Sequence, residues 1–560
     1  MAEKTEDRPA AEEKKTPAQQ IDELFKDVNR SDAPGLTVGV AQRGQRIYHQ
    51  GFGLACVQLG VANGRSTRMR IGSTSKHFTA VAALMLAQEG KLDLDAPVTR
   101  YLPELPALYE QATLRRLMSH VSGQRCYLDV NFVGNGRRLQ PPGSALAAQV
   151  RQSELNFPVG NKFIYNNGGY HLLSICIERV SGLAFEKFVA QRIFEPMGMF
   201  ATESAPDDFD LYPGLATLHV PKPGGGWRRG IFPTEEVRGE GGMISTVGDM
   251  LRWLEHLRKG NDTLLNDDSR GQLMRPALLN DGTSTQYALG LMVHPYRGVD
   301  VVHHGGGVIG GTCQMLTVPA HELDIVIITN GAAVSPIESA YKIIDLLLGD
   351  QLAPMIEMAK AADYATLIGT QYHASGSGML IGFAEAADPA KKEQLGLSLL
   401  GNPAVPLRRN GERLELPIET MALGPFSVAL APLPAEGTAP ASLEIKEGSS
   451  SERFERLAAT PPTAAEVAAD LGGNYFSVEA DASGTLVLDA DGKIEMRMQG
   501  RVGSIFYEVQ PLSSDVLRLQ AKDPTLPLVL IASIDRKNGK AAGMRLSSGR
   551  TRGLRFTRQA

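Results

Sequence analysis

The stretch Ser73-Thr-Ser-Lys76 places a hydroxyl and an amine three residues apart, at the start of a predicted helix over 73–89. Side chains at positions i and i+3 of a helix share one face, so these two groups are expected to meet. A serine hydroxyl becomes nucleophilic when a neighbour takes its proton, and burial lowers the pKa of a lysine enough for that role. The predicted helix is apolar nearly all round, which indicates burial. The pattern predicts Ser73 as a nucleophile assisted by Lys76, although S-x-x-K alone also arises by chance in a chain of this length.

A tyrosine and an amide stand two residues apart in Tyr165-Asn-Asn167, just before a second predicted helix. From an extended loop, both side chains point the same way. A phenolate near a lysine ammonium is a workable general base, and an amide can position both the amine and a substrate. We therefore predict that Tyr165 moves protons together with Lys76 and that Asn167 orients them. The alternative is a core tyrosine followed by a turn asparagine.

The third motif, His304-Gly-Gly306, ends a predicted strand. Gly306 leaves room for a substrate backbone alongside the strand. His304 would supply a hydrogen-bond donor or a positive charge, and the Gly307 N–H would join that of Ser73 in holding an oxyanion. The preceding His303 leaves open which histidine faces the site. The alternative is a glycine-rich hairpin with an incidental histidine.

Taken together and in this order, the motifs S-x-x-K, Y-x-N and H-x-G resemble the serine β-lactamase and penicillin-binding superfamily. The resemblance covers about residues 19–349. It lies with the branch in which H-x-G replaces K-T-G, which includes class C-like esterases, D-aminopeptidases and D-amino-acid amidases. Supporting matches are Gly90-Lys-Leu-Asp-Leu-Asp95, Leu117-Met-Ser-His-Val-Ser-Gly123, Phe194-Glu-Pro-Met-Gly198 and Gly241-Gly-Met-Ile-Ser-Thr246.

Strand patterns come from both ends of this region, with helix patterns between them. Apolar and β-branched runs predict strands at 36–40 and 46–51, and again at 289–293, 301–303, 314–318 and 324–329. We therefore predict an α+β, multidomain chain that opens with a serine β-lactamase-like catalytic domain over 19–349. Its antiparallel sheet would carry helices on both sides. Residues 1–18, dense in Lys and Glu, are predicted as a disordered tail.

After about Gly349 the sequence changes to short alternating runs broken by Gly and Pro, a texture typical of antiparallel barrels or sandwiches. The segment around Tyr372 is echoed around Tyr475. We predict two antiparallel β-barrel domains, over 350–455 and 456–560. The stretch 432–467, rich in Pro, Ala, Ser and Glu, is predicted as a linker between them.

A catalytic domain followed by two small barrels resembles the architecture of the D-aminopeptidases. In those enzymes a loop of the last barrel enters the active site, where an acidic residue pairs with the substrate's α-amino group. The resemblance implies that the matching loop here is Leu519–Val529, with Asp523 as the acid and Asp515 as the other candidate. The alternative is a solvated aspartate in a turn.

Composition excludes several classes of protein. The chain has 57 Lys and Arg against 62 Asp and Glu, a formal net charge of −5, so we expect no nucleic-acid or membrane partner. No apolar run approaches the roughly 20 residues of a membrane span, and the start lacks a signal-peptide pattern, which predicts a cytoplasmic protein. The four cysteines form no C-x-x-C pair, and His321-Glu322 lacks the second histidine of a zinc protease. We expect no metal and no cofactor.

The function predicted from the sequence is that of a serine hydrolase working through an acyl-enzyme. It would release N-terminal D-amino acids such as D-alanine from small peptides, amides and esters that carry a free amine. One alternative is a β-lactamase-like esterase or DD-carboxypeptidase. An alternative of another class is a non-catalytic peptide-binding protein on this fold. The sequence leaves the oligomeric state open and is compatible with a homodimer.

Overall fold

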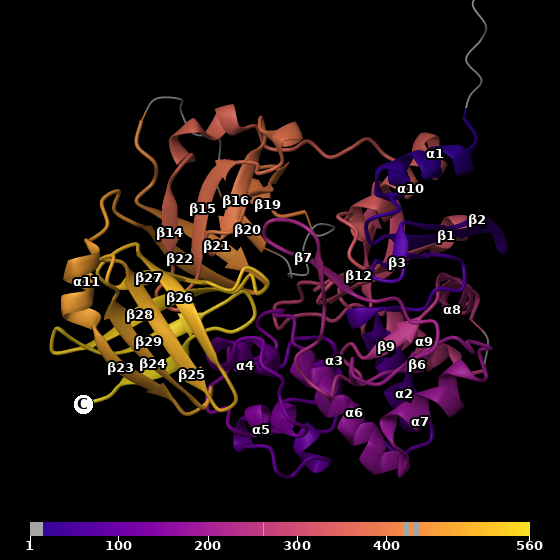
Figure 1. Cartoon of the computed structure of the whole chain (residues 1–560), viewed down its shortest axis with the longest axis horizontal. Coiled ribbons are helices and arrows are strands. Elements are labelled where there is room, and N and C mark those ends of the chain that lie inside the picture. The colour runs from indigo at the N-terminus through magenta and orange to yellow at the C-terminus, as the bar shows by residue number, and fades with distance from the viewer. Residues whose placement is uncertain (1–14, 261–262, 418–425, 430–436) are drawn as a thin grey trace, which may run out of the picture.

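The computed structural model describes residues 15–260, 263–417, 426–429 and 437–560. Figure 1 shows an α/β part in indigo to salmon and two β-sheet modules, in orange and yellow, beside it. The first helix, α1 (Pro17–Phe25), begins inside the predicted tail of residues 1–18, because Thr16 and Gln19 form a capping box and proline opens the helix. Of the predicted tail, residues 1–14 lie outside the described residues.

A six-stranded antiparallel sheet forms the centre of the α/β part. Its order is β10-β11-β12-β13-β1-β2, so strands from both ends of the region join in one sheet, as predicted. The strands are β1 (Leu36–Gln42), β2 (Gln45–Phe52), β10 (Met292–Tyr296), β11 (Val299–Val308), β12 (Gly311–Val318) and β13 (Leu323–Thr329). The sheet joins the two ends of this domain, and it carries the third motif on β11.

Helices cover both faces of this sheet, as the predicted fold requires. On one face, α1 and α10 (Pro336–Leu348) bury residues such as Phe25 and Ile343 against β1, β12 and β13. On the other, α8 (Val247–Lys259) packs on the same strands, and α2 (Lys76–Gln88) lies within the largest apolar core. The helix α2 is apolar nearly all round because it is enclosed by this core.

The remaining elements of the α/β part are short, apart from the 15-residue helix α6. The helices are α3 (Leu114–Met118), α4 (Tyr127–Asn135), α5 (Ser144–Val150), α6 (Asn167–Ser181), α7 (Phe185–Val189) and α9 (Asp267–Met274). The strands are β3 (Leu54–Cys56), β4 (Val61–Ala62), β5 (Met69–Arg70), β6 (Glu203–Ser204), β7 (His219–Pro221), β8 (Trp227–Arg229) and β9 (Met243–Ser245).

The first C-terminal module is a nearly closed antiparallel sheet of nine strands, in the order β17-β16-β15-β14-β22-β21-β20-β19-β18. The strands are β14 (Gln371–His373), β15 (Leu380–Glu385), β16 (Leu395–Leu399), β17 (Val405–Pro406), β18 (Arg408–Asn410), β19 (Arg413–Glu415), β20 (Phe426–Ala429), β21 (Ser442–Glu447) and β22 (Ser450–Arg456). The prediction of a linker over 432–467 was wrong for much of its length, because β21 and β22 form a hairpin inside this sheet.

The second module is a closed eight-stranded antiparallel barrel preceded by α11 (Ala464–Leu471). Its strands are β23 (Gly473–Ser477), β24 (Ala482–Leu488), β25 (Ile494–Gly500), β26 (Ser504–Pro511), β27 (Val516–Ala521), β28 (Val529–Lys537), β29 (Lys540–Ser547) and β30 (Leu554–Arg558). The echo seen in the sequence has a structural counterpart, since Tyr372 and Tyr475 are both buried on the first strand of their module.

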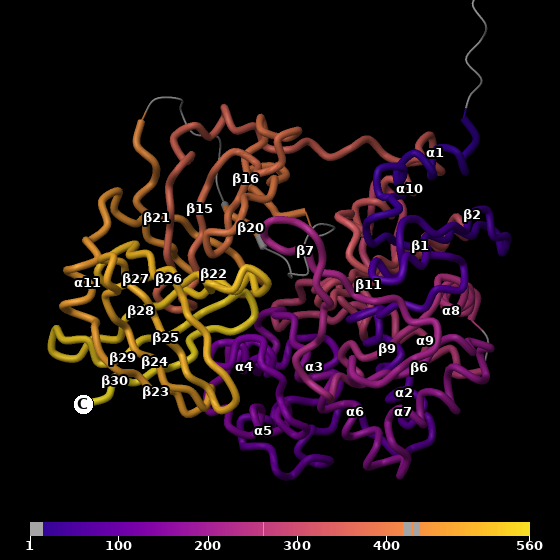
Figure 2. The backbone as a smooth tube through the Cα atoms, in the orientation of Figure 1, coloured from indigo at the N-terminus to yellow at the C-terminus, as the bar shows by residue number. Residues whose placement is uncertain are grey.

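One end of the closed barrel faces the α/β part. In an up-and-down barrel, every second connection lies at the same end. The four connections at this end, 478–481, 501–503, 522–528 and 548–553, each contact the α/β part, and we call them the facing loops. Helix α4 packs on β24, β25 and β26, beside the barrel in both Figure 1 and Figure 2.

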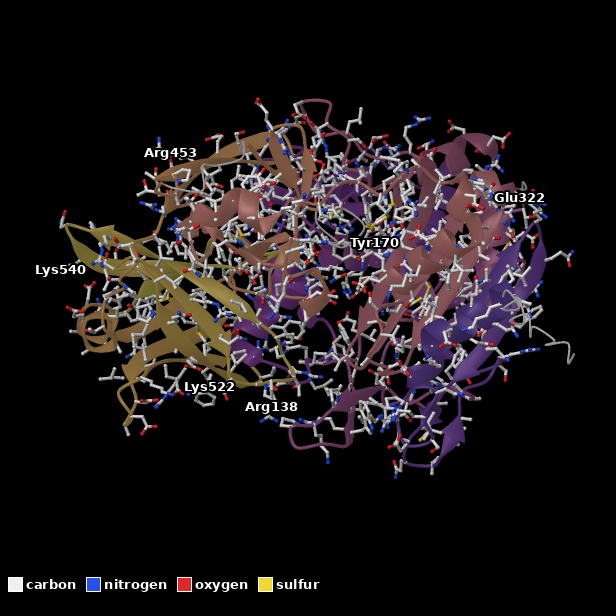
Figure 3. All side chains as sticks on the ribbon, turned by 90° about the horizontal axis from the view of Figure 1, so that it is seen from above. Arg138, Tyr170, Glu322, Arg453, Lys522 and Lys540 are labelled. Carbon is white, nitrogen blue, oxygen red and sulfur yellow. The ribbon has the colours of Figure 1, made fainter. Side chains whose placement is uncertain are left out.

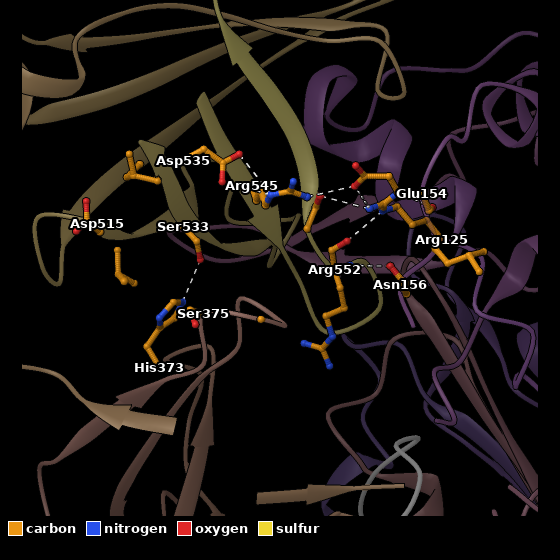
Figure 4. Close-up of a pocket in the computed structure, with 15 residues that line it drawn as sticks. Arg125, Glu154, Asn156, His373, Ser375, Asp515, Ser533, Asp535, Arg545 and Arg552 are labelled. Atoms are coloured by element: carbon orange, nitrogen blue, oxygen red, sulfur yellow. Dashed lines mark hydrogen bonds and ion pairs between the residues drawn. The ribbon is translucent and has the colours of Figure 1, made fainter. Parts of the chain in front are cut away.

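Arg125 joins the α/β part to the barrel. Its guanidinium donates to the Glu479 carboxylate at 2.8 Å, to the Arg552 carbonyl at 3.0 Å and to the Glu154 carbonyl at 2.6 Å. Arg125, Glu154 and Arg552 border a cavity of about 410 Å³ between the three parts of the chain. There His373 of the first module meets Ser533 of the barrel (Figure 4). The three parts are thus held together by buried polar contacts.

Figure 3 shows the extent of this assembly from above. Glu322 and Lys540 lie towards opposite ends of the molecule, and Tyr170 lies in the interior between them. No helix within the described ranges is long and apolar enough to cross a membrane.

We expect Arg125→Met to lower the free energy of unfolding by about 3–5 kcal/mol, because it leaves the buried Glu479 carboxylate without its partner. The measurement is urea denaturation. The control is Arg555→Met, which removes an exposed pair with Glu154 and should cost about 1 kcal/mol or less. Equal small losses in both variants would contradict the structural role of Arg125.

Candidate active site

The predicted nucleophile lies on a tight turn directly before a buried helix. Gly72–Ser75 form a 3₁₀ turn, and α2 begins at Lys76 rather than at Ser73. The i, i+3 spacing nevertheless brings the two side chains together, with Lys76 Nζ 3.1 Å from Ser73 Oγ. The first two predicted site residues are therefore in hydrogen-bond contact.

Lys76 is fully buried, and the atoms around its amine are neutral acceptors. Nζ donates to Asn167 Oδ1 at 2.7 Å and to the Glu240 carbonyl at 2.6 Å. Burial lowers the pKa of Lys76 to about 7. A neutral amine has two hydrogens and one lone pair, so with both hydrogens on these oxygens the lone pair is left for the Ser73 hydroxyl proton. The arrangement suits Lys76 to the role of general base.

Tyr165 and Asn167 reach the amine from the start of α6. Asn166 caps this helix by accepting from the Gly168 N–H at 2.7 Å, and Asn167 is its first residue. The Lys76 amine lies 4.7 Å from the centre of the Tyr165 ring. Burial raises the pKa of the Tyr165 hydroxyl well above its ordinary value, and nearby Ser73 and Arg550 oppose this only in part. In the free protein the Tyr165 hydroxyl is therefore protonated, and the phenolate predicted as a general base is disfavoured.

The third motif lies where β11 is open on one edge. β10 pairs with β11 only as far as His303, and the 72–75 turn packs against the residues beyond. A Cβ on Gly306 would lie 1.8 Å from the Ile71 carbonyl, so only glycine allows this approach. A Cβ on Gly307 would meet nothing within 4 Å. Gly307 therefore lies beside the 72–75 turn that carries Ser73, which we call the nucleophile turn, and next to open space.

Of the two histidines, His304 is the one whose ring lies beside Tyr165, with the ring centres 6.2 Å apart. Its Nε2 lies 2.9 Å from the Tyr287 hydroxyl and its Nδ1 2.5 Å from the Gly305 carbonyl. His303 instead contacts His294 and Gln314. Burial, together with the Lys76 charge, lowers the pKa of His304 to about 3, so its ring is neutral. The positive charge considered for His304 is not available there.

A cavity of about 560 Å³ opens at these groups. Ser73, Tyr165, His304, Gly306 and Gly307 all line it, and Lys76 and Asn167 lie buried behind them. The barrel also contributes to its wall. The residues that do so are Gly549 and Arg550, from the facing loop 548–553.

The structure does not bring Asp523 to this cavity. Asp523 lies in another facing loop, 522–528, where it accepts from Thr525 at 2.6 Å and its pKa is lowered by that contact and by Arg137, against the effect of burial. Asp515, the other acid considered, pairs with Arg536 at 2.6 Å. A loop of the last barrel does reach the cavity, as predicted. It is the loop 548–553 rather than 519–529, and its charged residue is the cation Arg550 rather than an acid.

Sequence reasoning missed several residues of the site. Arg550 and its partner Asp129, on α4, are 421 positions apart and carry no local signal. His120 lies inside the quoted stretch Leu117–Gly123, and its ring centre is 4.3 Å from that of Tyr165. Tyr287 belongs to none of the motifs on which the prediction rested. The glutamate whose carbonyl holds Lys76, Glu240, immediately precedes the quoted stretch that begins at Gly241.

The family model for beta-lactamase matches residues 21–348, more than half of the 560 residues. The chain belongs to this family. With the nucleophile turn and buried lysine described above, this makes it a serine hydrolase of the β-lactamase fold.

Individual relatives within the family extend beyond the catalytic domain. A D-aminopeptidase of Gluconobacter oxydans is 26% identical over 541 residues, which cover 94% of this chain and 96% of that protein. A D-aminopeptidase of Brucella anthropi is 26% identical over 68% of this chain and 74% of its own length. Penicillin-binding protein 4* of Bacillus subtilis is 25% identical over 57% of this chain and 72% of its own length.

A solved structure shares the whole architecture. The octameric penicillin-binding protein homologue of Pyrococcus abyssi matches with a TM-score of 0.53 and 18% identity, covering 96% of this chain and 99% of that one. This likeness confirms the predicted order of a β-lactamase-like domain followed by antiparallel barrel modules.

We expect kcat/KM to rise with pH up to about pH 7 and then to level off, because only neutral Lys76 can accept the Ser73 proton. Below that pH the amine is protonated, and the rate should fall about tenfold per pH unit. The raised pKa of Tyr165 keeps its hydroxyl protonated above neutrality. A flat profile from about pH 5 to pH 9 would contradict the role of Lys76.

Gly306→Ala should destabilise the fold by about 1–3 kcal/mol or more, because its Cβ would press on the Ile71 carbonyl. Gly307→Ala is the matched comparison, since its Cβ would enter open space and should change stability by less than about 1 kcal/mol. Thermal denaturation of both variants measures the difference. Equal melting temperatures would mean that the strand and the nucleophile turn are less closely packed than described.

Proposed function

We propose that this chain hydrolyses peptides, amides and esters of D-amino acids through an acyl-enzyme on Ser73. The observation that carries the proposal is the 3.1 Å contact between Ser73 Oγ and the buried amine of Lys76. The other two hydrogen-bond partners of this amine, Asn167 Oδ1 and the Glu240 carbonyl, are both neutral. A hydroxyl beside a base of this kind is an activated nucleophile.

The proposed reaction follows from the positions of these groups. Ser73 Oγ attacks the carbonyl carbon while its proton passes to Lys76 Nζ. The N–H groups of Ser73 and Gly307 bind the oxyanion. The Tyr165 hydroxyl donates a proton to the leaving nitrogen or oxygen as the bond to the carbonyl carbon breaks, and the Lys76 ammonium returns a proton to Tyr165. Water then attacks the ester carbonyl and gives its proton to Lys76 Nζ. Lys76 passes that proton to Ser73 Oγ as the ester C–O bond breaks, so the carboxylic acid leaves and Ser73 is free again.

The preference for D-amino acids is supported by the relatives rather than by one contact. The Gluconobacter oxydans protein that spans 94% of this chain is named a D-aminopeptidase, and it matches across the barrel modules as well as the catalytic domain. The requirement for a free amine has weaker support, since no carboxylate is among the described residues lining the cavity. The cytoplasmic location and the homodimer stay predictions.

The non-catalytic peptide-binding protein is the alternative that the site itself argues against. Retaining a serine, a buried lysine and a tyrosine within contact distance serves proton transfer, and binding alone gives no physical reason for it. The esterase and carboxypeptidase alternatives share the acyl-enzyme and differ in the group that leaves.

We expect Ser73→Ala to abolish hydrolysis of D-alanine p-nitroanilide, with a loss well beyond roughly a hundredfold, and to abolish labelling by a fluorophosphonate. The L-alanine anilide should react much more slowly with the unsubstituted chain. Lys76→Ala, which keeps the hydroxyl, should slow labelling without removing its site. Undiminished hydrolysis by pure Ser73→Ala would overturn the proposal, and absence of labelling in the unsubstituted chain would favour the binding protein.

A further inference from the structure

We propose that Arg550, on the facing loop 548–553 of the barrel, is the substrate-specificity residue of this site and that it binds a carboxylate of the substrate. This inference rests on the proposed function for the location of the scissile bond at Ser73. It departs from the expectation of an acid that reads an amine. The class of substrate that it selects is a short peptide with a free carboxylate close to the scissile bond.

The Arg550 guanidinium is paired with Asp129 along one edge, and its other edge is free to bind a ligand. Its Nε and Nη2 contact the Asp129 carboxylate at 3.2 Å. No described residue accepts a hydrogen bond from Nη1, and about a third of the side chain remains exposed at the cavity. Asp129 is nine-tenths buried, so the pair presents the cation to the cavity and keeps the anion behind it.

The loop that carries Arg550 is fixed in place from two directions. Asn156 of the α/β part accepts from the Arg552 N–H at 2.8 Å and donates to the Arg550 carbonyl at 2.9 Å. The Arg552 guanidinium donates to the Ser548 carbonyl at 3.1 Å within the loop, and to Glu447 of the first C-terminal module at 3.2 Å. A charged group held in this way loses little freedom when a ligand binds.

The charges facing the cavity favour an anion. Arg550 is the one charged side chain among the described residues that line it, because burial lowers the pKa of both histidines there, His303 and His304, and keeps them neutral. A substrate ammonium placed beside Arg550 would be repelled. A carboxylate would meet a planar donor group that suits it in shape and charge.

Within the proposal, the carboxylate belongs to the leaving residue. Arg550 lines the cavity into which Ser73 and Tyr165 open, so it can reach a group next to the scissile bond. In a dipeptide the leaving residue carries its own carboxylate next to the leaving nitrogen. A side-chain carboxylate on the residue that acylates Ser73 would offer the same chemistry from the other side, and the experiment separates the two sources.

The test measures binding to the full chain carrying Ser73→Ala, so that turnover plays no part. The first pair of ligands is D-alanyl-D-alanine and its C-terminal amide, and the second pair is D-glutamate amide and D-glutamine amide. We expect the free dipeptide to bind about 10- to 100-fold more tightly than its amide. Adding Arg550→Gln should remove that preference and leave the binding of the amide within about threefold.

Two further variants keep the test sound if Arg550→Gln folds poorly. The double change Asp129→Asn with Arg550→Gln removes both members of the pair and leaves no unpaired buried charge, and it should also lose the preference. Arg550→Lys keeps the charge without the planar fork and should retain part of it. The matched control is Arg555→Gln, an exposed arginine on β30 that pairs with Glu154, which should keep the full preference.

Each outcome decides the question. Loss of preference in the first pair assigns the carboxylate of the leaving residue, and loss in the second pair alone assigns a side-chain carboxylate. Equal binding of both members of each pair in the Ser73→Ala chain, or a preference that survives removal of Arg550, overturns the proposal. Fluorophosphonate labelling of the chain with Ser73 intact is scored separately, so failure of the hydrolase assignment is distinguishable from failure of this one.

Discussion

The burial of the Lys76 amine without a carboxylate partner is the constraint on which this site depends. A salt bridge would hold its pKa high and make it useless as a base at neutral pH. Glu240 lies close enough to form one, yet only its backbone carbonyl reaches Nζ. Its carboxylate instead contacts Tyr127 and His171. Burial lowers the pKa of His171, but Glu240 and Glu236 outweigh it and raise it to about 9, so the histidine serves as the glutamate's counter-ion.

The nucleophile and the oxyanion strand are joined by backbone contacts. Gly72 has a φ of +54°, and a Cβ there would lie 2.7 Å from the Gly307 nitrogen. On β11, the backbone of Gly306 comes so close to the Ile71 carbonyl that a Cβ there would lie 1.8 Å from its oxygen. Side chains at these positions would push the turn away from β11. The reactive geometry is therefore set by two close approaches of main chain, which the central sheet and α2 hold from either side.

Local patterns were sufficient to find the residues of the three motifs, which the structure brings together at one site. The three-residue spacing of Ser73 and Lys76 gives the same contact in a 3₁₀ turn as in a helix, and alternating apolar runs located the sheet strands to within a few residues. Composition misled at 432–467, because β21 and β22 carry charged residues on their exposed face and look like a linker. Counting along the chain could not choose between loops 522–528 and 548–553, because both lie at the same end of the barrel. The contact of Arg550 with Asp129 depends on how separate modules pack, and no local pattern encodes that.

The facing loop 548–553 also has a consequence for the order in which the protein is made. Asp129 is synthesised 421 residues before the arginine that covers it. The proposed nucleophile Ser73, its proposed base Lys76 and the strand β11 all belong to the α/β part and precede both barrel modules along the chain. During translation the reactive groups can therefore assemble before the cavity acquires its charged wall. With the proposed roles, the reactive groups and the specificity residue are therefore completed at different times. Evolution can change substrate choice by altering the loop 548–553 while the reactive groups stay intact.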